Sequence, residues 1–322
     1  MTSLQNDKEA TMRAVVVRTP GGPEALTVTE VPIPAPGAGQ VLVRVEAAAV
    51  NPVDVATRTG MLIDAGLMSP RPVIGIGWDV AGRVDGVGEG VTEFAVGDRV
   101  IGLRDRLDLS IGAYADYLVL DAAALAPAPH GLSAVEAATL PLNALTASQA
   151  LDLLDLPPGG AVLVTGAAGA LGGFAVELAA HRGWRVVANA DASDEEFLRA
   201  AGAEWFVPRT DDLADAVRRL VPGGVGAAVD AAVLGLPVLG AVRNRGTFVS
   251  VVAGAAPTPL RGITVREQWV AADGAALARI AVLAENRRLT IRVAETFPLA
   301  HAVKAHHRLT EGKLRGRLVL VP

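Results

Sequence analysis

The stretch Ala161–Arg182, AVLVTGAAGALGGFAVELAAHR, is the part of the sequence that decides the fold. It begins with a short apolar, β-branched run that ends at Thr165, and it closes with an amphipathic helical pattern. Between the two, Gly166, Gly169 and Gly172 follow at three-residue spacing. A strand, a glycine turn and a helix in this order are typical of the opening of a dinucleotide-binding βαβ unit.

Each glycine has an expected role in that unit. We expect Gly166 to permit the tight turn, Gly169 to let backbone N–H groups approach a pyrophosphate, and Gly172 to let the helix pack close to the strand. The helix N-terminus then offers unpaired N–H donors to the phosphates. The alternative is a buried strand–helix connection packed with small residues, since the chain holds 35 glycines. The predicted pyrophosphate-binding residues are Gly166, Ala167, Ala168, Gly169, Ala170, Leu171 and Gly172.

Composition narrows the classes of function. The chain has 322 residues, enough for two domains. Charged residues make up 20% and the net charge is −5 without a basic block, so we expect no nucleic-acid and no membrane partner. The chain holds no cysteine, which excludes disulfides, thiol catalysis and Cys-based zinc sites. The first residues, MTSLQNDKEATMR, lack the apolar core of a secretory signal, and we expect a soluble, cytoplasmic protein.

The order of patterns along the chain predicts an α/β protein with two domains. We expect residues 1–11 to form a disordered polar tail and residues 12–122, with their short strands and turn-rich connectors, a small β-rich barrel-like domain. Residues 123–288 alternate strands and helices, which predicts a doubly wound parallel sheet with right-handed crossovers. Residues 289–322 show strand, helix and strand, and we expect them to return to the first domain.

A set of motifs runs through nearly the whole chain in a characteristic order. They are NPVD and RTG, then GWDVAGRVDGVGEGVTEFAVGDRV, GAYADYLVL, LPLNALTASQAL, VTGAAGALGG, FPLAHAVKAH and GRLVLVP. This order resembles the medium-chain dehydrogenase/reductase superfamily, most closely its zinc-free, zeta-crystallin-like quinone oxidoreductase branch. The resemblance implies a GroES-like catalytic domain, a Rossmann cofactor domain, a cleft between them, and a homodimer joined through the cofactor-domain sheets.

The resemblance also bears on metal chemistry. Zinc-dependent members carry Cys and His ligands where this chain has Val50-Asn51-Pro52-Val53-Asp54. We therefore expect no zinc. Without a Lewis acid, the expected chemistry is hydride delivery from a reduced nicotinamide to an activated acceptor, a small apolar quinone or an α,β-unsaturated carbonyl.

Three residues of the first domain are the candidate catalytic groups. The resemblance places the Asn51 side chain near nicotinamide and substrate, while a turn former before Pro52 is the alternative. Asp54 is expected to cap the helix that follows it. Asp54 and Arg58 lie four residues apart and are expected to pair along one helical face, where a purely structural ion pair is the alternative. Relatives often carry tyrosines just after this segment, but the only tyrosines here are Tyr114 and Tyr117.

Further candidates belong to the cofactor site. The resemblance implies that Asn143 and Thr146 line the nicotinamide and phosphate cleft, although the Thr146 hydroxyl could instead bond its own helix backbone. Ser250 and Val251 end the strand GTFVSVV, at the carboxyl edge where ligands bind in parallel sheets. We expect Asp230 to cap a turn.

The choice of cofactor rests on Asn189, Asp191 and Arg209. The strand RVVAN ends at Asn189, and Asp191 follows at the spacing of a carboxylate that binds the ribose 2′-OH of NAD. Such a carboxylate repels a 2′-phosphate, and acidic residues 194–196 follow it. Arg209 matches a position at which relatives contact the adenosine phosphate, and its guanidinium suits a phosphate. The family default favours NADP(H), and NAD(H) stays open.

Three functions remain open from the sequence. The first is a zinc-independent, NAD(P)H-dependent reductase of a quinone or enone. The second is a specialised biosynthetic enoyl reductase or cyclase-like enzyme that acts on a bulky apolar substrate, which the missing tyrosines favour. The third is a nucleotide-binding sensor without catalysis.

Overall fold

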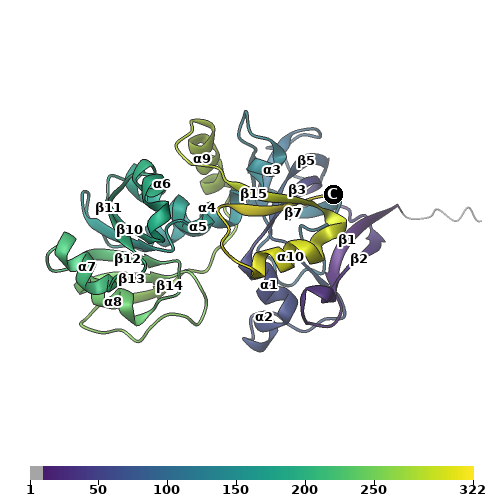
Figure 1. The fold of residues 1–322 in the computed structure, drawn as a ribbon. Coiled ribbons are helices and arrows are strands. Elements are labelled where there is room, and N and C mark those ends of the chain that lie inside the picture. The colour runs from purple at the N-terminus through teal and green to yellow at the C-terminus, as the bar shows by residue number, and fades with distance from the viewer. Residues whose placement is uncertain (1–9) are drawn as a thin grey trace, which may run out of the picture.

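The computed structural model describes residues 10–322 of the chain (Figure 1). Its first domain is built on two β-sheets. The smaller sheet has the order β2–β1–β4, with β1 (Thr11–Val17), β2 (Leu26–Pro32) and β4 (Ile74–Gly75). The predicted tail of residues 1–11 falls mostly outside the described residues, but Thr11 already pairs with Pro32. The strand therefore starts inside the segment predicted as a tail, because its apolar residues pack against the barrel.

The larger sheet joins both ends of the sequence. Its order is β15–β16–β3–β5–β6–β8, and β7 pairs with β3 as well. The strands are β3 (Gln40–Val50), β5 (Asp79–Val87), β6 (Arg99–Leu103), β7 (Tyr117–Asp121), β8 (Leu125–Pro127), β15 (Val293–Pro298) and β16 (Arg317–Val321). β8 pairs with β6, so the predicted domain boundary at residue 122 falls one strand early. β16 pairs antiparallel with β3, which brings the predicted return segment back to the first domain.

Short helices complete the first domain. Asn51 is the N-cap of α1 (Pro52–Thr59), and Pro52 at the first helical position has the fixed φ that a helix start accepts. Gly60 then ends α1 in the left-handed conformation, with φ of 85°. The other helices are α2 (Met61–Asp64), α3 (Ala134–Ala137) and α10 (Ala302–Thr310). Figure 1 shows α10, in yellow, packed beside the first domain with β15 and far from the second domain.

The second domain is a parallel sheet covered by helices on both faces. Its order is β11–β10–β9–β12–β13–β14, all in parallel, which confirms the predicted doubly wound sheet. This strand order is the one typical of dinucleotide-binding domains. The strands are β9 (Ala161–Thr165), β10 (Arg185–Ala190), β11 (Ala203–Pro208), β12 (Val225–Asp230), β13 (Val242–Ser250) and β14 (Thr264–Glu267). The helices are α4 (Pro141–Asp152), α5 (Ala170–His181), α6 (Glu195–Ala200), α7 (Leu213–Leu220), α8 (Leu236–Ala241) and α9 (Gly274–Glu285).

The alternation of side chains along the strands decides which helices lie on which face. Val162 and Val164 of β9 pack with α4, α5 and α9, whereas Leu163 between them packs with α7 and α8. The first of these clusters continues into the first domain, where Trp78 and Ile101 belong to it. One continuous apolar core therefore joins the two domains.

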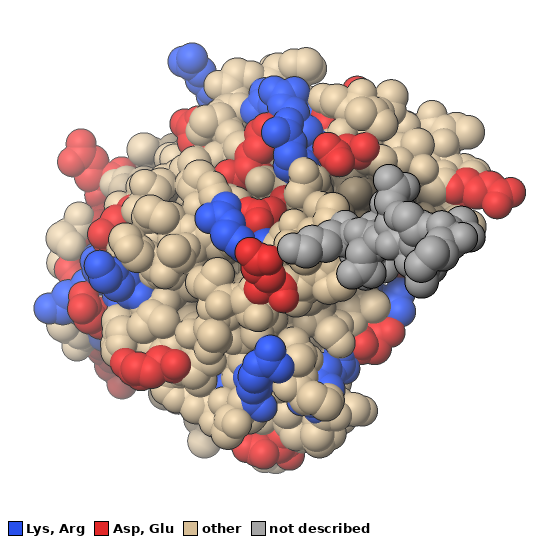
Figure 2. Space-filling view, turned by 90° about the vertical axis from the view of Figure 1, so that its right-hand side faces the viewer, with Lys and Arg blue, Asp and Glu red and all other residues tan. Residues whose placement is uncertain are grey.

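The surface carries both signs of charge. Figure 2 views the side of the molecule that carries the first domain, and acidic and basic side chains are intermixed there between wide uncharged areas. Within residues 10–322, no helix combines the length and apolar character needed to cross a bilayer.

Candidate functional site

The turn after β9 has the geometry that the glycine spacing predicts. Gly166 has a φ of 56°, in the left-handed region that favours glycine. Gly169 is the N-cap of α5, and its N–H donates to the Gly166 carbonyl at 2.9 Å. A Cβ on Gly172 would lie 2.8 Å from the Gly166 carbonyl carbon and closer still to its oxygen, so no side chain fits there. The helix N-terminus thus begins directly at the carboxyl end of a buried central strand.

This turn lies where the strand order of the sheet reverses. β9 is flanked by β10 on one side and β12 on the other, and ligands of doubly wound sheets bind at such a switch point. The Thr165 hydroxyl donates to Asp230 at 2.6 Å across β9 and β12. Asp230 also accepts the N–H groups of Leu234 and Gly235, so its predicted turn-capping role is confirmed.

Asp191, which favours NAD(H), and Arg209, which favours NADP(H), form an ion pair with each other. Arg209 Nη2 lies 2.8 Å from Asp191 Oδ2, and the Arg209 side chain is 68% exposed. Asp191 also accepts from the backbone N–H and the hydroxyl of Ser193, and these bonds lower its pKa. Asp194 lies in a bidentate pair with Arg315 at 2.6 and 2.7 Å. The acidic loop is therefore matched by arginines, and the repulsion expected for a 2′-phosphate is weaker than the sequence suggests.

Three other predicted cofactor residues, near the carboxyl ends of β10 and β13, make structural contacts of different kinds. Asn189 is buried in β10 and donates to the Val207 carbonyl of β11, so it holds two strands together. The Ser250 hydroxyl donates to the Val252 carbonyl and shapes the loop after β13. Val251 packs on the core that joins the domains.

Asn51 is the centre of a buried hydrogen-bond network between the domains. Its amide nitrogen donates to Asp79 Oδ2 at 2.7 Å, and its amide oxygen accepts from Asn143 Nδ2 at 3.0 Å. Asp79 Oδ1 accepts the Leu142 N–H in the first turn of α4 at 2.6 Å. Asn143 also accepts from the guanidinium of Arg317 in β16. Asn51 and Asn143 thus bond to each other, and both side chains are already bonded to protein groups.

Sequence reasoning missed Asp79 and Arg317. A single carboxylate inside the otherwise apolar run GWDVAG is the signal that would have singled out Asp79. The alternative reading of Thr146 is confirmed, because its hydroxyl donates to the Leu142 carbonyl of its own helix at 2.6 Å.

Asp54 has different partners from those predicted. It is the third helical residue of α1 rather than the N-cap, and it still caps the helix through a capping box, because its Oδ2 accepts the Asn51 N–H at 2.7 Å. The same oxygen accepts the Tyr114 hydroxyl at 3.0 Å, and Tyr114 meets His306 edge-on with ring centroids 5.9 Å apart. Asp54, Tyr114 and His306 are all fully buried. His306 is therefore a packed residue of the first domain's interior.

The predicted ion pair between Asp54 and Arg58 is wrong. Arg58 donates instead to the Gly21 carbonyl at 2.6 Å. Because α1 packs against the barrel on the Asp54 side, the carboxylate faces Tyr114 across the core while the guanidinium reaches the loop before β2. Arg58 therefore makes a structural contact with the loop before β2 instead of the predicted pair with Asp54.

Burial controls the protonation of these acids. Burial raises the pKa of Asp54 and that of Asp79 to about 7. Burial also lowers the pKa of His306 to about 4 and that of Arg317 to about 10. Asp54 Oδ1 has no hydrogen-bond partner within residues 10–322, so it is the atom that can hold a proton without losing a bond.

Asp54→Asn should therefore change how stability depends on pH. The folded-state pKa lies above the ordinary value of 3.8, so the wild type loses stability as pH rises from 3.8 to about 7 and no further above it. The asparagine does not titrate. The difference in unfolding free energy, variant minus wild type, should rise over that range by at most about 1.4 kcal/mol per pH unit. Chemical denaturation at several pH values measures it.

The matched control is Asp64→Asn, on an exposed aspartate of α2. Surface substitutions of this kind change stability within about 0.5 kcal/mol. A pH-independent difference for Asp54→Asn would show that Asp54 stays ionised in the folded protein.

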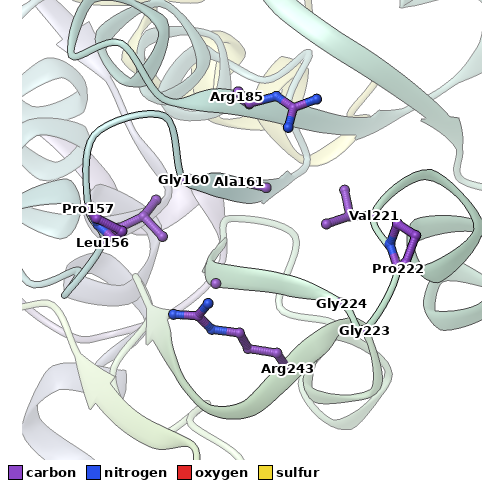
Figure 3. Close-up of a pocket in the computed structure, with 11 residues that line it drawn as sticks. Leu156, Pro157, Gly160, Ala161, Arg185, Val221, Pro222, Gly223, Gly224 and Arg243 are labelled. Carbon is purple, nitrogen blue, oxygen red and sulfur yellow. The ribbon is translucent and has the colours of Figure 1, made fainter.

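A pocket of about 300 Å³ lies at the opposite edge of the parallel sheet (Figure 3). Its walls include Ala161 and Arg185, the first residues of β9 and β10, and Arg243 near the start of β13. The glycine turn follows the carboxyl end of β9, at the other edge of the sheet. This pocket is therefore separate from the predicted dinucleotide site.

No group of three His, Asp or Glu side chains in the described part of the chain is arranged to hold a metal ion. At the position where zinc-dependent relatives have ligands, the Asn51 amide is already bonded on both sides. The residues present do not fit a zinc ion at this place.

Comparison with known proteins agrees with this architecture. A model of the alcohol dehydrogenase GroES-like domain matches residues 37–130, and a model described as zinc-binding dehydrogenase matches residues 201–320. Alcohol dehydrogenase 1 of Caenorhabditis elegans is 31% identical over 75% of this chain and 76% of that protein. The solved quinone oxidoreductase of Coxiella burnetii has a TM-score of 0.86 and 28% identity, covering 97% of this chain and all of that one. A mycobacterial structure complexed with NADPH has a TM-score of 0.82 and 29% identity, with 97% and 100% covered. The chain belongs to the medium-chain dehydrogenase/reductase superfamily and, within it, to the quinone oxidoreductase-like branch.

Proposed function

We propose that this protein is an NAD(P)H-dependent reductase of a quinone or an α,β-unsaturated carbonyl, and that it works without zinc. The observation that carries the proposal is the close packing of Gly172 against the Gly166 carbonyl, at the point where the strand order of the doubly wound sheet reverses. That geometry frees a helix N-terminus for a pyrophosphate. The quinone oxidoreductase from Coxiella burnetii, similar over its whole length, supports the acceptor class.

The residues present fit a nicotinamide dinucleotide. The backbone N–H groups from Ala170 onward would hold the pyrophosphate, and the loop of Asp191 and Arg209 would hold the adenosine ribose. Val251, Val53 and Leu62 bring apolar surface from both domains to the core at the junction. When bound, the reduced nicotinamide supplies a hydride. The protein would orient the acceptor and exclude water from the transfer.

The absence of zinc is part of the proposal. Two observations support it: the chain has no cysteine, and the Asn51 amide is already hydrogen-bonded to Asp79 and Asn143. An acceptor that needs little polarisation suits such a site better than a simple ketone or alcohol does.

We also propose that NADP(H) is the preferred cofactor. Arg209 is mostly exposed and already sits 2.8 Å from Asp191, so a 2′-phosphate would find a guanidinium beside the carboxylate. Replacing Arg209 with methionine should raise the dissociation constant of NADPH by about tenfold, because charge-assisted bonds are the strong ones, and should leave that of NADH within about threefold. Parallel fluorescence titrations of both cofactors measure this. A loss that is equal for the two cofactors would contradict a role for Arg209 at the 2′ position.

The activity is tested by the oxidation of NADPH and NADH with a panel of quinones and enones. Turnover with at least one simple acceptor is expected, unchanged after treatment with a chelator. Binding without turnover on the whole panel would favour the specialised biosynthetic enzyme or the nucleotide sensor instead. The homodimer, the cytoplasmic location and the lack of nucleic-acid or membrane partners stay predictions.

A further inference from the structure

Arg292 reaches the glycine turn from a distant part of the chain. It lies directly before β15, in the segment that returns to the first domain. Its Nη1 donates to the Ala168 carbonyl at 3.0 Å, and its Nη2 donates to the Gly169 carbonyl at 2.8 Å. One guanidinium thus holds two consecutive carbonyls of the turn predicted to bind a pyrophosphate.

A glycine in α5 makes room for this contact. A Cβ on Gly173 would lie 2.7 Å from Arg292 Nη2, so any larger residue would displace the guanidinium. The Phe197 ring lies 4.3 Å from the guanidinium carbon and covers it. The Arg292 backbone is fixed as well, because its carbonyl accepts the Arg317 N–H at 2.9 Å. Gly172 leaves room for the Gly166 carbonyl, and Gly173 leaves room for the Arg292 guanidinium. Both adjacent positions therefore require glycine for a packing reason.

The two bonds have a consequence for phosphate binding. The peptide unit is planar and trans, so its N–H points away from its carbonyl. A fixed Gly169 carbonyl therefore fixes the direction of the Ala170 N–H, the first helical donor of α5. The guanidinium also satisfies carbonyl oxygens that would otherwise present negative charge beside an anion. A cation and a preoriented donor are thus placed at the same turn.

We propose that Arg292 is a positioning residue for the cofactor, which holds the glycine turn in the shape that binds the pyrophosphate. This inference rests on the proposed function. It assigns part of the cofactor's affinity to a residue more than a hundred positions away from the glycine motif, in the other domain's return segment. Because the bonds go to the backbone of the turn, the effect should fall on binding and leave the chemical step nearly unchanged.

Two variants test the proposal in the full-length protein. Arg292→Met removes the guanidinium, and Gly173→Ala keeps the arginine but fills its space. Each should raise the NADPH dissociation constant by about tenfold, the range of a lost charge-assisted bond, with little change in kcat at saturating cofactor. Alanine is a better helix former than glycine, so the unfolding temperature of Gly173→Ala should not fall. Arg288→Met is the control, because Arg288 is exposed in the same connection and makes no side-chain hydrogen bond within residues 10–322.

Amide hydrogen exchange of the free protein gives a readout that does not need the cofactor. The amides of residues 167–171 should exchange faster in Arg292→Met than in the wild type and the control. NADPH affinity within twofold of wild type in both variants would overturn the proposal. Weaker binding with unchanged exchange at the turn would also overturn it, since the charge alone would then be responsible. If the wild type bound neither NADPH nor NADH, the proposed function would fall and this inference with it.

Discussion

Replacing Gly172 with alanine should abolish dinucleotide binding. The new methyl group would lie 2.8 Å from the Gly166 carbonyl carbon and the Ala167 Cα, distances that real Cβ atoms essentially never show. These neighbours are backbone atoms, so the turn itself must open for the side chain to fit. We expect the NADPH dissociation constant to rise at least about 100-fold. The unfolding free energy should fall by about 2 kcal/mol or more, as overpacked sites do. Fluorescence titration and calorimetry measure the two effects.

The neighbouring residue supplies the control for this substitution. Gly173→Ala adds the same methyl group to the same helix but meets only the end of the Arg292 side chain and the Phe197 ring. It should therefore keep its stability while Gly172→Ala loses it. Equal stability and binding in the two variants would show that the close approach at Gly172 has no energetic importance.

The parts of the fold that were predictable are those that depend on local pattern. The strand, turn and helix of residues 161–182 follow from apolar periodicity and glycine spacing, and the structure has each element there. The alternation of strands and helices likewise predicts the parallel sheet of the second domain. The boundary at residue 122 failed because β8, the short run Leu125–Pro127, has too few residues to show a period and is a strand only through its pairing with β6.

The site was less predictable because its contacts join distant residues. Asn51 meets Asp79 across 28 positions and Asn143 across 92. Spacing along the chain carries no information about such pairs. The expected pair of Asp54 with Arg58 shows the opposite error, because a favourable four-residue spacing was outweighed by the packing that turns Asp54 toward Tyr114. Tyr114 itself was noted in the sequence, but its buried place beside Asp54 depends on the whole barrel.

Asp79→Ala should be the most destabilising substitution in the network between the domains. Asp79 is fully buried, and its two oxygens accept one N–H from each side of the junction, from the Asn51 amide and from Leu142. Alanine leaves the Leu142 N–H buried without an acceptor, leaves the Asn51 amide only its long bond of 3.4 Å to the Ala49 carbonyl, and removes the carboxylate from the first turn of α4. We expect the unfolding free energy to fall by about 2–5 kcal/mol, because each buried donor that loses its acceptor costs about 1–3 kcal/mol. Chemical denaturation monitored by tryptophan fluorescence measures it.

Asp79→Asn separates the carboxylate's chemistry from its shape. Its amide nitrogen must face either Leu142 or Asn51, and both present donors, so one donor–donor contact remains in either orientation. The isosteric variant should therefore also lose stability, by about 1–3 kcal/mol for the donor that is left unpaired. Asp85→Ala, on an exposed position of the same strand β5, should stay within about 0.5 kcal/mol of wild type.

A double-mutant cycle measures the bond between Asn51 and Asp79. Asp79→Ala and Asn51→Ala together should lower the unfolding free energy by less than the sum of the two single variants, because the two residues share one hydrogen bond. Strict additivity would mean that the bond between Asn51 and Asp79 contributes nothing to the stability of the network.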